Sequence, residues 1–102
     1  MMSYTYWYEL VDSLSDSEKA DYLRSVFHKD VSFDPLHNLN DAWSLTENEA
    51  IEKVELEREG GSTYACLLTI DNTRFDMWCA NTAQEAIVGA IMKAYDAGIR
   101  IW

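Results

Sequence analysis

The chain has 102 residues, 48% of them hydrophobic, and its eighteen acidic and eight basic side chains give a formal net charge of −10. This length suffices for one hydrophobic core, and the composition argues against disorder or a long linker. The charge opposes direct binding to nucleic acid or an anionic membrane and favours a partner with a basic surface. No run reaches the roughly 20 apolar residues of a membrane-spanning helix and no signal-peptide pattern opens the chain, so we expect one cytoplasmic domain over residues 1–102.

Two helices are predicted in residues 1–30. The apolar positions with helical spacing are Trp7, Leu10, Val11 and Leu14 in the first, and Ala20, Leu23, Val26 and Phe27 in the second. The first helix should run from about Tyr4 to Leu14. Ser15 followed by Glu18 fits a capping box, which begins the second helix either separately or after a kink in the first.

A loop and a short helix are predicted in residues 31–50. The content of Asp, Asn and Pro indicates a loop, and Pro35 forces the residue before it towards an extended conformation. Asn38 or Asn40 then serves as the cap of a short helix. Its apolar spacing comes from Leu39, Ala42, Trp43 and Thr46.

Three strands are predicted in residues 51–80, namely 51–59, 62–70 and 74–80. Two-residue turns at Gly60-Gly61 and Asn72-Thr73 would join them into an antiparallel meander. That register places Val54, Leu56, Ala65, Leu67, Trp78 and Ala80 on one face, and Tyr64, Cys66, Leu68, Ile70, Phe75, Met77 and Cys79 on the other. Both faces of the second and third strands are then apolar, which predicts helices against both faces of the sheet.

A long alanine-rich helix is predicted over residues 82–98. Thr82 followed by Glu85 fits a second capping box, and Gly98 suits the left-handed residue that closes a helix. The apolar face of this helix is formed by Ala83, Ala86, Ile87, Ala90, Ile91, Ala94 and Tyr95. The predicted fold is therefore α+β, a three-stranded meander in an α-β-α sandwich, and the apolar tail 99–102 should dock on it.

Several short motifs lie along the middle and end of the chain, namely Phe33-Asp-Pro-Leu-His37, Leu39-Asn-Asp-Ala-Trp43, Trp78 and Thr82-Ala-Gln-Glu-Ala-Ile87. Their arrangement resembles the phage ABA-sandwich domain family, a group of small bacteriophage and prophage proteins. The resemblance covers about residues 33–95. It implies a phage origin and a sandwich architecture, and it carries no catalytic residues over to this chain.

The residues that could perform chemistry are few. His28, His37, Cys66 and Cys79 could supply four zinc ligands by number, but no pair has the usual ligand spacing. The predicted register sets Cys66 opposite Cys79, where two reduced, buried thiols are favoured over a disulfide or a nucleophile. We expect no metal, no cofactor and no enzymatic activity. A pocket that joined either histidine with carboxylates would favour catalysis instead.

Three carboxylates alternate along the first strand. Glu55, Glu57 and Glu59 share one side of it with Lys53. One interpretation is an edge strand that charge protects from aggregation. The other is an acidic strip that replaces nucleic-acid phosphates in a basic groove.

Three tyrosines near the start, Tyr4, Tyr6 and Tyr8, cannot all be buried on one helix face. An exposed tyrosine is a favoured interface residue, so we predict that they and the three glutamates bind a partner.

Two functions from different classes follow. The first is a phage-encoded inhibitor that binds a host defence protein, such as a CRISPR effector, by placing an acidic face in its nucleic-acid groove. The second is a phage assembly accessory that forms a homo-oligomer through its tail or its aromatic cluster. An enzyme ranks third.

Overall fold

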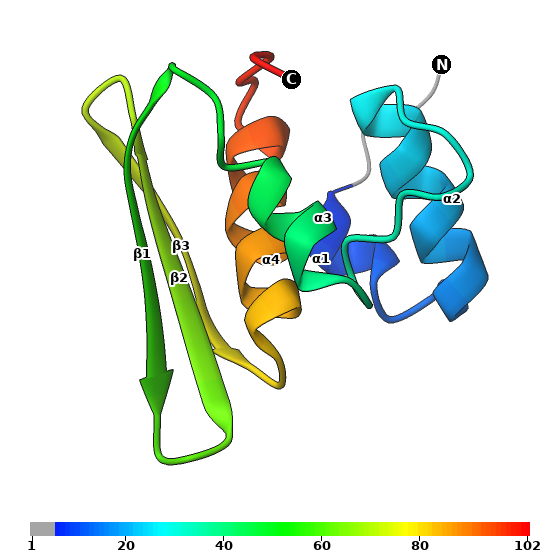
Figure 1. Cartoon of the computed structure of the whole chain (residues 1–102), viewed down its shortest axis with the longest axis horizontal. Coiled ribbons are helices and arrows are strands. Elements are labelled where there is room, and N and C mark those ends of the chain that lie inside the picture. Colours follow the sequence, from blue (N-terminus) through cyan, green and yellow to red (C-terminus); the bar gives the residue numbers. More distant parts are fainter. Residues whose placement is uncertain (1–5) are drawn as a thin grey trace.

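A three-stranded antiparallel sheet lies at one side of the molecule and the helices lie at the other (Figure 1). The computed structural model describes residues 6–102. The strands are β1 (Ile51–Glu59), β2 (Thr63–Ile70) and β3 (Thr73–Ala80), in the spatial order β1-β2-β3. The helices are α1 (Trp7–Leu10), α2 (Asp16–Phe27), α3 (Leu39–Ser44) and α4 (Ala83–Asp96). The predicted α+β meander with a long C-terminal helix is confirmed.

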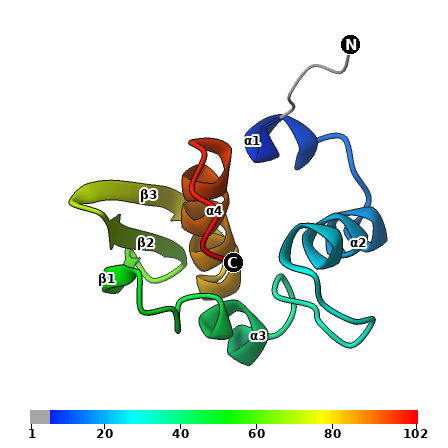
Figure 2. The same ribbon diagram turned by 90° about the horizontal axis from the view of Figure 1, so that it is seen from above.

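One face of the sheet is covered by α4. Figure 2 shows α4 beside the sheet, with α1, α2 and α3 beyond it or at its flanks, and none of these four helices lies on the other face. In this respect the prediction of helices on both faces is wrong. We call the covered face the inner face and the uncovered one the outer face.

The register of the strands explains this difference. Three residues, Gly60, Gly61 and Ser62, form the first loop, because Glu59 pairs with Thr63. The second loop is Asp71-Asn72, whose φ angles of 51° and 60° suit a two-residue hairpin. The predicted first turn, Gly60-Gly61, is one residue shorter than the observed loop, and the predicted second turn, Asn72-Thr73, lies one residue later than the observed one. A shift of one residue moves every side chain of a strand to the opposite face.

Most apolar side chains of the three strands therefore lie on the inner face. The pairing places Val54, Leu56, Cys66, Leu68, Ile70, Phe75 and Met77 there, and Leu68 and Cys66 are fully buried. The outer face receives the alternate residues, which are mostly charged or threonine. Cys66 pairs with Met77, so the predicted pairing of Cys66 with Cys79 is wrong.

A bulge near the end of β3 separates the two cysteines. Cys66 pairs with Met77 but Tyr64 pairs with Ala80, so two residues of β3 lie opposite one residue of β2. Cys79, at φ 62°, is one of these two residues.

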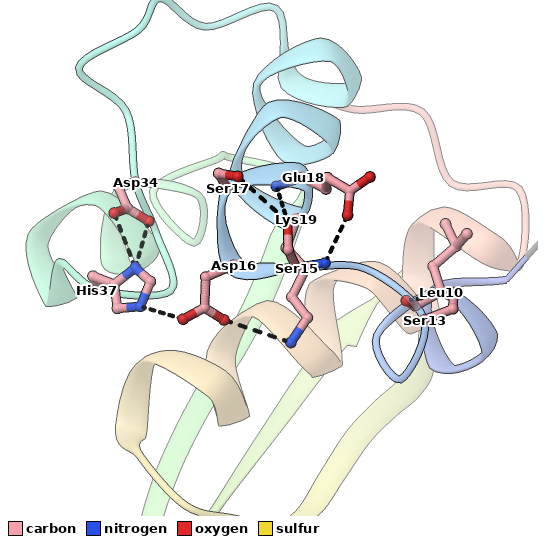
Figure 3. Close-up of polar contacts among 9 residues, drawn as sticks. All are labelled: Leu10, Ser13, Ser15, Asp16, Ser17, Glu18, Lys19, Asp34 and His37. Atoms are coloured by element: carbon pink, nitrogen blue, oxygen red, sulfur yellow. Dashed lines mark hydrogen bonds and ion pairs between the residues drawn. The ribbon is translucent and has the colours of Figure 1, made fainter.

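The helix ends follow the predicted caps. The Ser15 hydroxyl accepts the Glu18 N–H, and the Glu18 carboxylate accepts the Ser15 N–H at 2.9 Å (Figure 3). The Thr82 hydroxyl accepts the Glu85 N–H at 3.1 Å, and Asn38 caps α3. The Glu85 carboxylate accepts the N–H of Asn81 instead of that of the cap residue, so the second capping box is half formed.

The first helix is shorter than predicted. It begins at Trp7 and ends at Leu10, after which a turn leads to α2 as a separate helix. The apolar tail docks as predicted, because the Trp102 Nε1–H donates to the Leu45 carbonyl at 2.8 Å. Within the described part of the chain, no helix is long and apolar enough to span a bilayer.

Candidate functional site

The three glutamates of β1 form a row on the outer face. Glu55, Glu57 and Glu59 alternate with residues that point inward, and β1 is an edge strand with one free side. Neighbouring members of the row are about 7 Å apart, because alternate residues of a strand are two rises of about 3.4 Å apart. We call these three residues the acidic row. The prediction that they share one side of a strand is confirmed.

The negative charge of the row is concentrated near the β1–β2 hairpin. The Lys53 ammonium lies 2.6 Å from the Glu55 carboxylate, and this hydrogen bond and charge lower the pKa of Glu55. Glu57 and Glu59 are exposed, and within residues 6–102 neither side chain makes an ion pair. The first carboxylate is therefore partly neutralised and the other two present full charge.

Beside the acidic row, the outer face carries a small apolar area. Ala65 and Leu67 in the central strand point to this face, yet they are only 1% and 6% exposed. Trp78 follows the inward-pointing Met77 and is 42% exposed. The predicted register placed Trp78 on the face of Val54 and Leu56, under a helix, so the exposure of its ring was not predicted.

The predicted tyrosine cluster lies elsewhere. Tyr4 falls outside the described residues. Tyr6 and Tyr8 stack with ring centroids 5.6 Å apart and planes within 7°, and Tyr8 is 64% exposed. Helix α1 lies beyond α4 from the sheet (Figure 2), so these rings and the acidic row do not share a surface.

The two cysteines have opposite environments. Cys66 is buried on the inner face, and burial raises the pKa of its thiol to about 12. That thiol stays protonated at neutral pH and is a poor nucleophile. Cys79 is exposed, and both thiols are free. In the part of the chain that the structure describes, no three His, Cys, Asp or Glu side chains gather to hold a metal ion.

A cavity of about 250 Å³ lies between α1, the start of α2, the Pro35 loop and α4. Its apolar lining consists of Trp7, Val11, Leu36, Met77 and Gly89. Its polar and ionisable lining consists of Tyr8, Asp16, Lys19, His37, Thr82, Glu85, Lys93 and Asp96. We call this space the α1–α4 cavity. Its residues are far apart in the sequence, so no local motif could have predicted it, although His37 was considered as a candidate.

The α1–α4 cavity does join a histidine with carboxylates. His37 Nδ1 lies 3.0 and 3.1 Å from the two Asp34 oxygens, and its Nε2 lies 3.9 Å from Asp16 Oδ2 (Figure 3). A histidine between carboxylates can donate or accept a proton. Among the described residues, however, its polar partners are these two carboxylates, so no hydroxyl or thiol nucleophile is paired with it.

No protein-family model, curated protein or solved structure matches this chain. A function for this chain is therefore inferred from its fold class and the geometry of its surfaces.

Proposed function

We propose that this chain is an acidic, phage-derived protein that inhibits a host defence protein by occupying its basic nucleic-acid groove. The observation that carries the proposal is the acidic row, which lies on the free edge strand of an uncovered sheet face. The motifs similar to those of the phage ABA-sandwich family support a phage origin, and a CRISPR effector is one protein with such a groove.

The spacing of the row suits competition by charge. One strand of duplex DNA carries a phosphate about every 3.4 Å of helix axis, whereas the row has a carboxylate about every 7 Å. These carboxylates lie within about one Debye length of their neighbours at physiological salt, so a basic groove responds to their combined field. The row therefore attracts a basic groove without matching each phosphate position.

Binding requires no reaction at the site. Occupation of the groove is enough to exclude nucleic acid, and the net charge of −10 accelerates association with a basic partner. The exposed Trp78, on β3 and separated from the row by β2, adds an aromatic contact of the kind that dominates interface energies.

The test compares two triple charge reversals. The first variant carries Glu55→Lys, Glu57→Lys and Glu59→Lys. The control variant carries Asp12→Lys, Glu47→Lys and Glu49→Lys, at exposed positions outside the strands and outside the acidic row, and changes the net charge equally. Each protein is used to capture partners from a nuclease-treated bacterial lysate at about 50 and about 500 mM salt, and bound proteins are identified by mass spectrometry.

The expected result is one nucleic-acid-binding protein that the wild type and the control variant retain at low salt. High salt or added DNA should release it, and the acidic-row variant should lose it. Equal retention by both variants would remove the acidic row from the binding site.

Self-association in phage assembly is the second candidate. The stacked and exposed pair of Tyr6 and Tyr8 favours it, because exposed aromatic rings often mark an interface. Sedimentation of the wild type and of the variant Tyr6→Ser/Tyr8→Ser in high salt separates the candidates. An oligomer that persists in high salt and dissociates in the variant would support assembly, and a monomer would support the inhibitor.

A further inference from the structure

The geometry points to a ligand site in the α1–α4 cavity for a small primary amine that carries one apolar ring. This site is separate from the acidic row, because the cavity lies on the helical side of β3 and the row lies on the outer face of β1. The inference does not depend on the proposed function.

The walls of the cavity are apolar and are held in place. Trp7 is 7% exposed, and its backbone N–H donates to Asp96 Oδ2 at 2.9 Å, which ties α1 to α4. Gly89 forms part of the wall because it has no side chain, and Met77 lies directly against it. These contacts keep the two sides of the cavity apart at a defined distance.

The volume of the cavity limits the size of a ligand. An apolar cavity of about 150 Å³ can hold one benzene-sized molecule. At about 250 Å³, this cavity has room for one ring with a short chain. It is too small for most drug-sized ligands, which occupy pockets from about 300 Å³ upward.

The charged lining selects an amine. Asp16, Glu85 and Asp96 supply three carboxylates, against the two ammonium groups of Lys19 and Lys93. Each ammonium already has a carboxylate nearby, because Lys19 lies 3.9 Å from Asp16 and Lys93 lies 3.8 Å from Asp76. With His37 neutral, three carboxylates against two ammonium groups leave the lining one net negative charge, so a cationic ligand is favoured over a carboxylate.

Asp16 is placed to receive the ammonium group. Its oxygens lie 3.9 Å from Lys19 Nζ and from His37 Nε2 (Figure 3). Both distances exceed the range of a hydrogen bond, so the carboxylate retains capacity to accept. The ring of Trp7 can also attract a cation at its face.

The experiment uses three probes that share a ring and a two-carbon chain. They are 2-phenylethylamine, 2-phenylethanol and 3-phenylpropionate, each added to the full ¹⁵N-labelled chain at neutral pH and low salt. We expect saturable shifts of amide signals confined to α1, the Pro35 loop and α4. The amine should bind at least about tenfold tighter than the propionate, with the alcohol between them.

Two matched substitutions test the location. Val11→Phe puts a ring into the cavity and should weaken amine binding at least about tenfold. Val31→Phe makes the same change at a position that is 87% exposed and outside the cavity, and should leave binding unchanged. If Val11→Phe fails to fold, Asp16→Asn replaces it. That variant should weaken binding of the amine and leave binding of the uncharged alcohol unchanged. The loss should be only several-fold, because the Asp16 side chain is 77% exposed and water screens its charge.

Four results would overturn the inference. They are the absence of saturable shifts with the amine, shifts centred outside the cavity, equal or tighter binding of the propionate, and unchanged amine affinity in a folded Val11→Phe or Asp16→Asn variant.

Discussion

Gly89 in α4 lies directly against Met77 in β3. A Cβ atom built on Gly89 would lie 2.6 Å from Met77 Cγ and 3.1 Å from Met77 Cβ. Contacts that short do not occur without a shift of one partner, and Met77 Cβ is fixed to the sheet. The absence of a side chain at residue 89 therefore lets the helix approach the sheet and shapes one wall of the α1–α4 cavity.

Replacement of Gly89 with alanine should destabilise the fold. Alanine gains about 1 kcal/mol over glycine inside a helix, but overpacking costs about 1–3 kcal/mol. We expect a net loss of about 1 kcal/mol in the free energy of unfolding, measured in urea. In the Met77→Ala background the 2.6 Å contact with Cγ is absent and only the 3.1 Å contact with Cβ remains, so the same change should cost less than it does in the wild type. Stabilisation of the wild-type background would contradict this packing.

The two thiols should differ in reactivity. Cys79 is exposed and should react with a thiol reagent in the native protein. Cys66 is buried and burial raises the pKa of its thiol to about 12, so it should react after denaturation only. Ellman's reagent should thus detect one fast thiol, which Cys79→Ser abolishes. A second fast thiol in the native protein would place Cys66 outside the core.

The docked Trp102 should contribute to stability through its ring and its N–H. The ring meets Phe27 edge-on at 5.7 Å between centroids, and Nε1 donates to the Leu45 carbonyl. Trp102→Phe removes the hydrogen bond and should lower the free energy of unfolding by about 1 kcal/mol. Trp102→Ala also removes a half-buried ring and should lower it by about 2–3 kcal/mol. Trp43→Ala, at a 41% exposed ring, should cost less than about 1 kcal/mol. Chemical unfolding would rank the three.

Acid should weaken the first capping box. The N–H and the hydroxyl of Ser15 hold the Glu18 carboxylate and lower its pKa below the ordinary value of 4.5. The folded state therefore favours the charged form. The stability that the charged carboxylate contributes is fully present above about pH 4.5 and is lost as the pH falls through the folded-state pKa. Glu18→Gln should flatten the acid side of the stability profile, and NMR titration should find Glu18 below 4.5. A higher titration point would contradict the capping geometry.

Lys53 should reduce the negative charge of the acidic row. Its ammonium partly neutralises Glu55 at 2.6 Å and lowers the pKa of that carboxylate. In Lys53→Gln, the Glu55 pKa should rise towards its ordinary value when followed by NMR. If the proposed function is correct, binding of the basic partner should strengthen at low salt and converge with wild type at high salt. An unchanged affinity at low salt would show that Glu55 is not part of the binding site.

The sequence by itself determined the features that depend on neighbouring residues. Ser15 with Glu18, Thr82, and Asn38 mark helix starts, because a cap needs a side chain within three residues of the amide that it accepts from. The alternation of charges along β1 placed the acidic row on one side of its strand for the same reason.

Only the tertiary structure decided which face of the sheet is covered and which residues meet across it. The first hairpin uses Ser62 as a third loop residue, and this one-residue difference moves the apolar side chains of β2 and β3 onto the face of Val54. The sequence around Gly60 is compatible with either loop length, so burial against α4 selects the register. The α1–α4 cavity likewise arises from segments that are separated along the chain, and packing alone brings Asp16 near His37.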